Sequence, residues 1–133
     1  MKAKTLIHQN DLPFIDLSLL FDLCEDDMES ILEMVDIFID SLDQIIQQLN
    51  LSCEAKNAEQ VYMYAHKAKS SLSIVQIKPL WQIMDILEEE ARAKIWKQHW
   101  TSSIQKLSTI WQQIPEMLQQ WKQTHIQTQP VQK

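Results

Sequence analysis

The chain contains 133 residues, and none of them is glycine. Glycine is the usual residue at hairpin turns and β-bulges, where the backbone φ angle is often positive. A β-rich fold is therefore difficult to build from this sequence, whereas helices can be joined by turns that other residues make. The lack of glycine favours an all-α fold.

Apolar residues recur at spacings of three and four from Met28 to Leu49, which is the strongest periodic signal in the chain. Such spacing places apolar side chains on one face of a helix. Apolar residues recur at the same spacing, less regularly, in three later segments and in one short segment before Met28. We predict helices over residues 17–23, 27–49, 58–75, 79–93 and 102–121. Together they predict an antiparallel four-helix bundle with a short extra N-terminal helix.

The length fits one domain, with residues 14–122 as the bundle, 1–13 as a loose lead and 123–133 as a polar tail. Pro79 suits the first turn of a helix, whereas Pro115 falls inside one and is expected to kink or split it. Cys24 and Cys53 have neither the spacing of a metal site nor the number of a disulfide framework, so we expect two reduced thiols.

The formal net charge is −6 at pH 7. Nucleic-acid binding requires clustered Lys and Arg, and the sequence has no such cluster, so we expect no nucleic-acid partner. The apolar runs are short and interrupted by charges, and the N-terminal Met-Lys-Ala-Lys lacks the apolar run of a signal peptide. These features predict a cytoplasmic protein without a membrane partner, and we expect a monomer.

His66 lies beside the apolar stripe of the predicted helix 58–75. It is about 100° round the helix from Ala65, a stripe residue, so its side chain should point to solvent. Its neighbours three and four residues away are Tyr62, Met63, Lys69 and Ser70. A histidine on such a ridge is placed to be touched by another macromolecule. Judged by position alone, a surface histidine with accidental neighbours fits equally well.

Other chemistry finds less support. A metal site in a bundle would need inward-pointing carboxylates and histidines at helical spacing, and His66 has Lys69 where a ligand would be needed. Ser70 and Ser71 lack a glycine-flanked elbow and an acid partner. A phosphate-binding loop cannot be built without glycine. The five tryptophans are more simply core or partner-facing residues than a ligand pocket.

The sequence around His66 resembles the AHxLKGSS signature of histidine-containing phosphotransfer (HPt) domains: it reads Ala65-His66-Lys67-Ala68-Lys69-Ser70-Ser71. The likeness extends over roughly residues 14–121. It includes an entry segment, Phe14-Ile15-Asp16-Leu17 with Leu20, then a long helix with Phe38, and then Leu80 with Leu87-Glu88.

The resemblance implies a role for each matching residue. His66 matches the phosphoacceptor, Lys69 matches the cation beside it, and Glu88 falls where relatives carry a polar residue that hydrogen-bonds the imidazole. The exposed flank is the implied docking face for a receiver domain, and its residues are Tyr62, Met63, Lys67, Ser70 and Ser73. Ala68, Ser70 and Gln76 depart from the family pattern, and the last two bear on how closely a receiver can approach.

The implied function is that of a phosphorelay intermediate in two-component signal transduction. His66 would accept a phosphoryl group from a receiver-domain aspartate and pass it to another, the receivers belonging to response regulators or hybrid histidine kinases. Such a phosphocarrier needs no cofactor and no metal of its own, and has no autokinase activity. The alternative is a degenerate HPt-like bundle that binds a receiver or another partner without transferring phosphate.

Overall fold

The structure, a computed structural model, describes residues 14–128, except for the side chains of residues 125–128. The elements in chain order are β1 (Ile15–Asp16), α2 (Ser18–Leu23), α3 (Met28–Glu54), α4 (Ala58–Leu72), β2 (Gln76–Ile77), α5 (Lys78–Ala91) and α6 (Trp100–Thr128). The all-α prediction is confirmed. The predicted lead (1–13) and the end of the predicted tail (129–133) lie outside the described residues.

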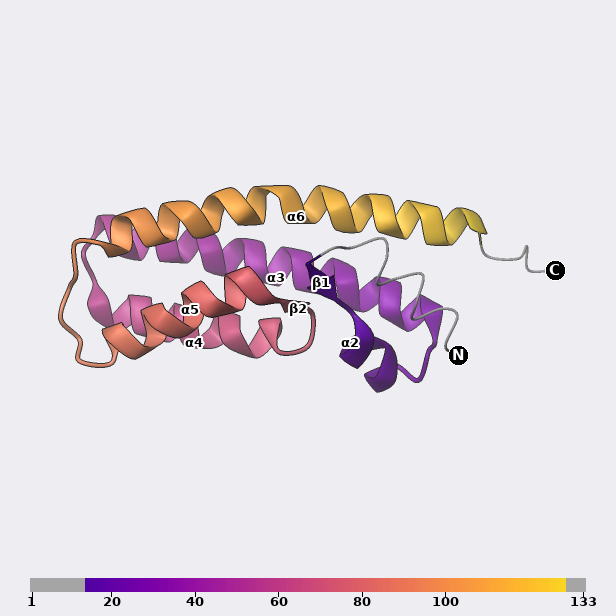
Figure 1. Ribbon diagram of the computed structural model, residues 1–133, viewed down its shortest axis with the longest axis horizontal. Helices are drawn as coiled ribbons and strands as arrows, with labels where there is room; N and C mark the ends of the chain where they lie inside the picture. Colours follow the sequence, from indigo (N-terminus) through magenta and orange to yellow (C-terminus); the bar gives the residue numbers. More distant parts are fainter. Residues whose placement is uncertain (1–13, 129–133) are drawn as a thin grey trace.

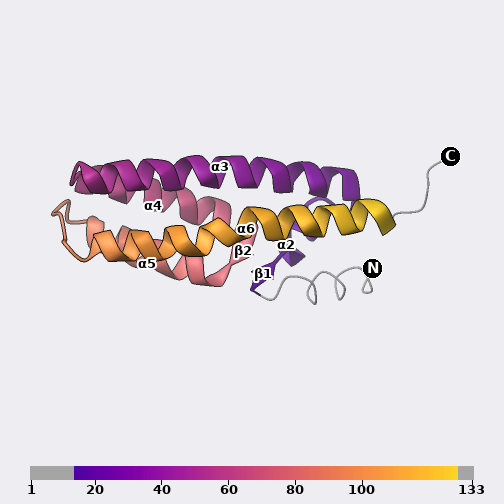
Figure 2. The same cartoon turned by 90° about the horizontal axis from the view of Figure 1, so that it is seen from above.

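The four long helices pack along one another. α3 contacts α4 and α6, and α5 contacts α4 and α6. The longest two, α3 and α6, run side by side along the molecule (Figures 1 and 2). The shorter α4 and α5 cover one end of this pair, and α2 lies beneath the other end (Figure 1). No helix in the described part of the chain is long and apolar enough to cross a membrane.

The core is built from the apolar stripes of all these helices. Burying a large apolar side chain stabilises the fold by about 1.5–3 kcal/mol, so the stripes together drive the packing. α6 contributes Trp100, Trp111 and Trp121, each less than 5% exposed. Phe38 and Phe21 pack edge-on against Trp111 and Trp121, respectively. The long α6 is therefore held to α3 and α2 by aromatic contacts.

The turns use other residues where glycine would be common. Glu25, Asp26, Lys56 and Lys94 all have positive φ angles, between 52° and 62°. The left-handed conformation costs a non-glycine residue about 1–2 kcal/mol, which the surrounding helix packing must offset. These turns follow the ends of α2, α3 and α5, so the connections remain short without glycine.

Several helix ends differ from the prediction. α3 extends to Glu54 instead of Leu49, because its polar last turns are bonded to the rest of the bundle: Asn50 donates to the Ser108 hydroxyl at 3.1 Å. α4 ends at Leu72 instead of Val75. The chain beyond it forms β2, whose Ile77 pairs antiparallel with Ile15 of β1. The sequence did not predict this pair, since two residues are too few to show a period.

α6 continues past both predicted limits. The helix runs through Pro115 without being split and ends at Thr128 instead of near residue 121. Proline removes one backbone hydrogen bond, but Ile114 and Leu118 on either side are fully buried in the core. Packing of this stripe keeps the helix continuous across the proline.

Candidate functional site

The candidate site is centred on α4, whose buried stripe fixes the direction of His66. Asn57 caps the helix by accepting a hydrogen bond from the backbone N–H of Gln60 at 3.1 Å. Ala65 is fully buried, and the next residue, His66, has a side chain that is 63% exposed. The imidazole therefore stands on the outer face of the bundle, as predicted from the stripe.

Glu88 of α5 holds the imidazole. Its Oε2 lies 2.7 Å from His66 Nδ1, and its side chain is only 8% exposed. A hydrogen bond from Lys69 holds the pKa of Glu88 below its ordinary value, and His66 lowers it further, although burial opposes both effects. An ionised carboxylate can only accept hydrogen bonds, so His66 Nδ1 carries the ring proton. In the neutral imidazole, the lone pair is then on Nε2.

Lys69 lies one turn after His66 but is engaged by two carboxylates. Its ammonium donates to Asp85 Oδ1 at 2.6 Å and lies 2.9 Å from Glu88 Oε1. It also lies 4.9 Å from the centre of the Trp81 ring. Hydrogen bonds to Asp85 and Glu88 raise the pKa of Lys69, so the side chain is fully charged at neutral pH.

Tyr62 lies one turn before His66 on α4 and contacts the face of the imidazole ring. Its ring is stacked on the His66 imidazole with the centroids 6.3 Å apart and an interplanar angle of 11°. The Arg92 guanidinium lies 5.6 Å from the centre of the Tyr62 ring. With Glu88 at Nδ1 and Tyr62 against the ring face, two contacts limit rotation of the imidazole.

A polar groove of about 600 Å³ runs beside His66 between α3 and α4. The α4 wall includes Lys67, Ser70 and Ser71, and the α3 wall includes Ser41 and Gln44. The serine and glutamine side chains of this groove can form hydrogen bonds but carry no charge. Lys67 therefore gives the groove its positive charge.

Comparison with known proteins identifies the family. The family model described as the Hpt domain matches residues 33–124, which include α4, α5 and the whole site. The chain belongs to the HPt domain family. HPt domains are phosphocarrier modules of phosphorelays. A search of curated protein sequences gives no match.

A solved structure shares the fold of this HPt domain. It is the crystal structure of histidine-containing phosphotransfer protein B from Pseudomonas aeruginosa PAO1, with a TM-score of 0.75 and 21% sequence identity. The match covers 84% of this chain and 96% of that one. At this level of identity the likeness concerns the fold.

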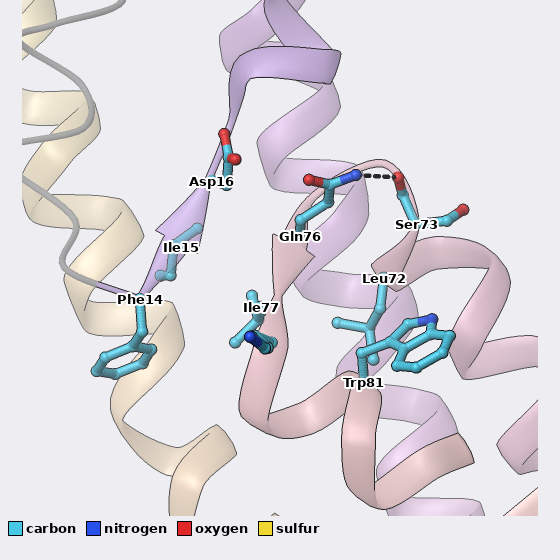
Figure 3. Close-up of a pocket in the computed structure, with 9 residues that line it drawn as sticks. Phe14, Ile15, Asp16, Leu72, Ser73, Gln76, Ile77 and Trp81 are labelled. Carbon is cyan, nitrogen blue, oxygen red and sulfur yellow. Dashed lines mark hydrogen bonds between the residues drawn. The ribbon is translucent and has the colours of Figure 1, made fainter.

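The residues singled out from the sequence do not all lie in one place. Met63 is 42% exposed on α4, and Lys67 and Ser70 line the polar groove. Ser73 instead lines a second groove of about 480 Å³ between β1 and the start of α5, together with Trp81 (Figure 3). The predicted docking flank is thus divided between two sides of α4.

Two site residues of the HPt domain were missed by the sequence analysis. Asp85 binds Lys69, and Arg92 lies over Tyr62. Asp85 precedes Glu88 by three residues and therefore shares its helix face, which was the available signal. Within the described residues, no group of three or more His, Cys, Asp and Glu side chains is placed to hold a metal ion.

A second histidine–carboxylate pair lies at the C-terminal end of α5, two residues beyond Glu88. His99 Nε2 is 2.7 Å from Glu90 Oε1, which also accepts a hydrogen bond from Trp100 Nε1 at 2.9 Å. Here Nε2 is the engaged nitrogen, whereas in His66 it is Nδ1. The two pairs would therefore present opposite ring nitrogens to a reagent. The side chains of His8 and His125 lie outside the described residues.

Proposed function

We propose that this HPt domain is a phosphorelay intermediate, and that His66 carries the phosphoryl group on Nε2. The observation that supports this assignment is the contact of His66 Nδ1 with the buried Glu88 carboxylate, in a side chain that is otherwise 63% exposed. This contact directs the lone pair to the nitrogen that a partner can reach. A surface histidine with accidental neighbours would have no such fixed tautomer.

The chemistry needs only groups that the chain and a receiver supply. The Nε2 lone pair attacks the phosphorus of a receiver's aspartyl phosphate, and the bond from phosphorus to the aspartate oxygen breaks. The ring becomes an N-phosphorylated imidazolium, whose positive charge the Glu88 carboxylate stabilises through Nδ1–H. In the onward step an aspartate of a second receiver attacks phosphorus and the P–N bond breaks, which restores the neutral ring.

The source of the phosphoryl group is then another protein. A chain without glycine offers no glycine-rich cradle for a nucleotide, so we expect no autokinase activity. Receiver domains contribute their own Mg²⁺ and acidic pocket. The proposed partners are therefore receiver domains of response regulators or hybrid histidine kinases, which a monomeric HPt domain meets in the cytoplasm.

The proposed docking face extends from the polar groove onto apolar surface. Ile37 and Met34 of α3 are 57% and 39% exposed, and they line a smaller pocket with Ile74. Ser41 and Ser71 line both this pocket and the polar groove, so the two are continuous. An apolar patch beside a polar groove at the acceptor fits a transient protein partner better than a small substrate.

One observation favours the alternative function, a bundle that binds a receiver without accepting phosphate. Ser70 stands in the wall of the groove one turn from His66, where the family pattern has glycine. Its Cβ and hydroxyl can hold a receiver away from the ring, and positioning accounts for much of the catalysis in phosphoryl transfer.

One experiment distinguishes the phosphorelay intermediate from the interaction bundle. The protein is mixed with candidate receivers that have been phosphorylated with a small phosphodonor, and both complex formation and acid-labile protein phosphate are followed. A relay gains label while the receiver loses it, and a second receiver then removes the label. A receiver that binds tightly but never transfers phosphate would establish the interaction bundle.

A further inference from the structure

Asp85 is an acidic side chain that the proposed transfer chemistry does not use. It lies on α5 three residues before Glu88, and its side chain is 46% exposed. Its Oδ1 nevertheless accepts the shorter of the two hydrogen bonds from Lys69, at 2.6 Å against 2.9 Å for Glu88. An exposed carboxylate thus competes directly with the site for its cation.

The two carboxylates keep the Lys69 ammonium away from the nitrogen that would carry the phosphoryl group. Glu88 contacts the imidazole with Oε2 and Lys69 with Oε1, so its carboxylate group separates the ammonium from the ring. Lys69 therefore lies on the Nδ1 side of His66. The phosphoryl group would be on Nε2, across the ring from Glu88, and Lys69 cannot contact it there while it remains bound to both carboxylates.

We propose that Asp85 is a positioning residue that holds Lys69 away from the acceptor, and that a phosphoryl group on His66 draws Lys69 off Asp85. This inference rests on the proposed function and concerns the regulation of the same site. By withholding the cation, Asp85 lowers the share of phosphoryl group that His66 retains at equilibrium and favours its onward transfer. Lys69 acts as a cation exchanged between two anions.

Trp81 reports the exchange. The Lys69 ammonium lies over its ring, and the same indole borders the groove between β1 and α5 that Phe14 flanks on the other side (Figure 3). When Lys69 leaves Asp85, it leaves Trp81 as well. Phosphorylation of His66 would therefore alter the indole environment in this second groove, which Ser73 of the predicted docking flank also lines.

The test compares Asp85→Asn with a matched control, Glu59→Gln. Glu59 is 72% exposed on α4, two turns before His66 on the same flank, and its removal changes the charge equally. With a shared pool of phosphorylated receiver, Asp85→Asn should raise the ratio of phosphorylated to free protein about two- to fivefold, the range of one exposed ion pair. The control should leave this ratio unchanged.

The fluorescence of Trp81 gives a second readout, which would not respond to phosphorylation if Asp85 had only a structural role. Phosphorylation should alter the indole emission of the wild type, alter it less in Asp85→Asn, and leave a Trp81→Phe protein unaffected. An unchanged phosphoryl ratio in Asp85→Asn, or an unchanged Trp81 emission on phosphorylation, would overturn the inference while leaving the relay intact. If neither wild type nor Asp85→Asn accepts phosphate, the proposed function fails and the inference falls with it.

Discussion

Replacing Glu88 by Gln changes one atom of the site, because an amide nitrogen takes the place of a carboxylate oxygen. If the remaining oxygen faces Lys69, the amide donates to His66 Nδ1, and the ring proton must move to Nε2. If the remaining oxygen faces His66, the amide NH2 points at the Lys69 ammonium, and two hydrogen-bond donors then face each other without an acceptor. Either way, the arrangement that directs the lone pair to Nε2 is weakened.

The size of the effect follows from the hydrogen bonds involved. A bond to a charged group contributes about 1.5–3 kcal/mol and a neutral one about 0.5–1.5, so the exchange costs about 1 kcal/mol at the imidazole. The weaker contact between Lys69 and residue 88 adds little to this cost, because Lys69 still donates its 2.6 Å hydrogen bond to Asp85. We expect phosphorylation to slow about fivefold, since 1.36 kcal/mol corresponds to a factor of ten. The melting temperature should fall by about 4 °C.

The assay combines kinetics with nuclear magnetic resonance of ¹⁵N-labelled imidazole, which distinguishes the two tautomers. Wild type should carry its proton on Nδ1 of His66, and Glu88→Gln should show a substantial Nε2–H population. Glu59→Gln is the control, because it removes an equal charge from an exposed site. The reasoning would be refuted by a variant that keeps Nδ1–H and accepts phosphate at the wild-type rate.

Three further predictions concern the same face. Because the pKa of Glu88 is lowered on folding, its stabilising contribution is complete above its ordinary value of 4.5 and is lost as the pH falls through the lower folded value. Urea unfolding at pH 7 and pH 3 should therefore show a smaller loss for Glu88→Gln than for wild type. Lys69→Ala should impair transfer more than Lys67→Ala, and equal effects would indicate general surface potential instead. Ser70→Gly should speed transfer by opening the groove while lowering stability by about 0.5–1 kcal/mol, and a slower variant would show that the partner uses the serine.

The helices could be predicted from the sequence because each has its own apolar stripe. Their ends could not be, because they depend on partners far away in the chain. Ser52 looks like a loop residue in the sequence, yet it is buried and its hydroxyl lies 3.2 Å from Gln60 Oε1 of α4. Pro115 was expected to kink or split its helix, and the buried residues beside it keep the helix unsplit. Local pattern gives the type of an element, and packing decides where it stops.

The site shows the same division. The exposure of His66 follows from one helix, because a single stripe determines which residues face outward. The ion pair of Lys69 with Asp85 depends on the register between α4 and α5, which the periodicity of either helix leaves open. The resemblance predicted Lys69 as a cation beside His66, and the structure adds that two carboxylates bind this cation.

The most direct test of the account is to identify the ring nitrogen that carries the phosphoryl group. Wild type and His66→Gln are incubated with a phosphorylated receiver, and the bond is assigned from ³¹P and ¹⁵N spectra. We expect one phosphohistidine, on Nε2 of His66, and no label on His66→Gln, whose free energy of unfolding should fall by about 1 kcal/mol because the bond of the imidazole to the buried Glu88 carboxylate is lost. Phosphate on Nδ1 of His66, or on Nδ1 of His99 in the variant, would contradict the account.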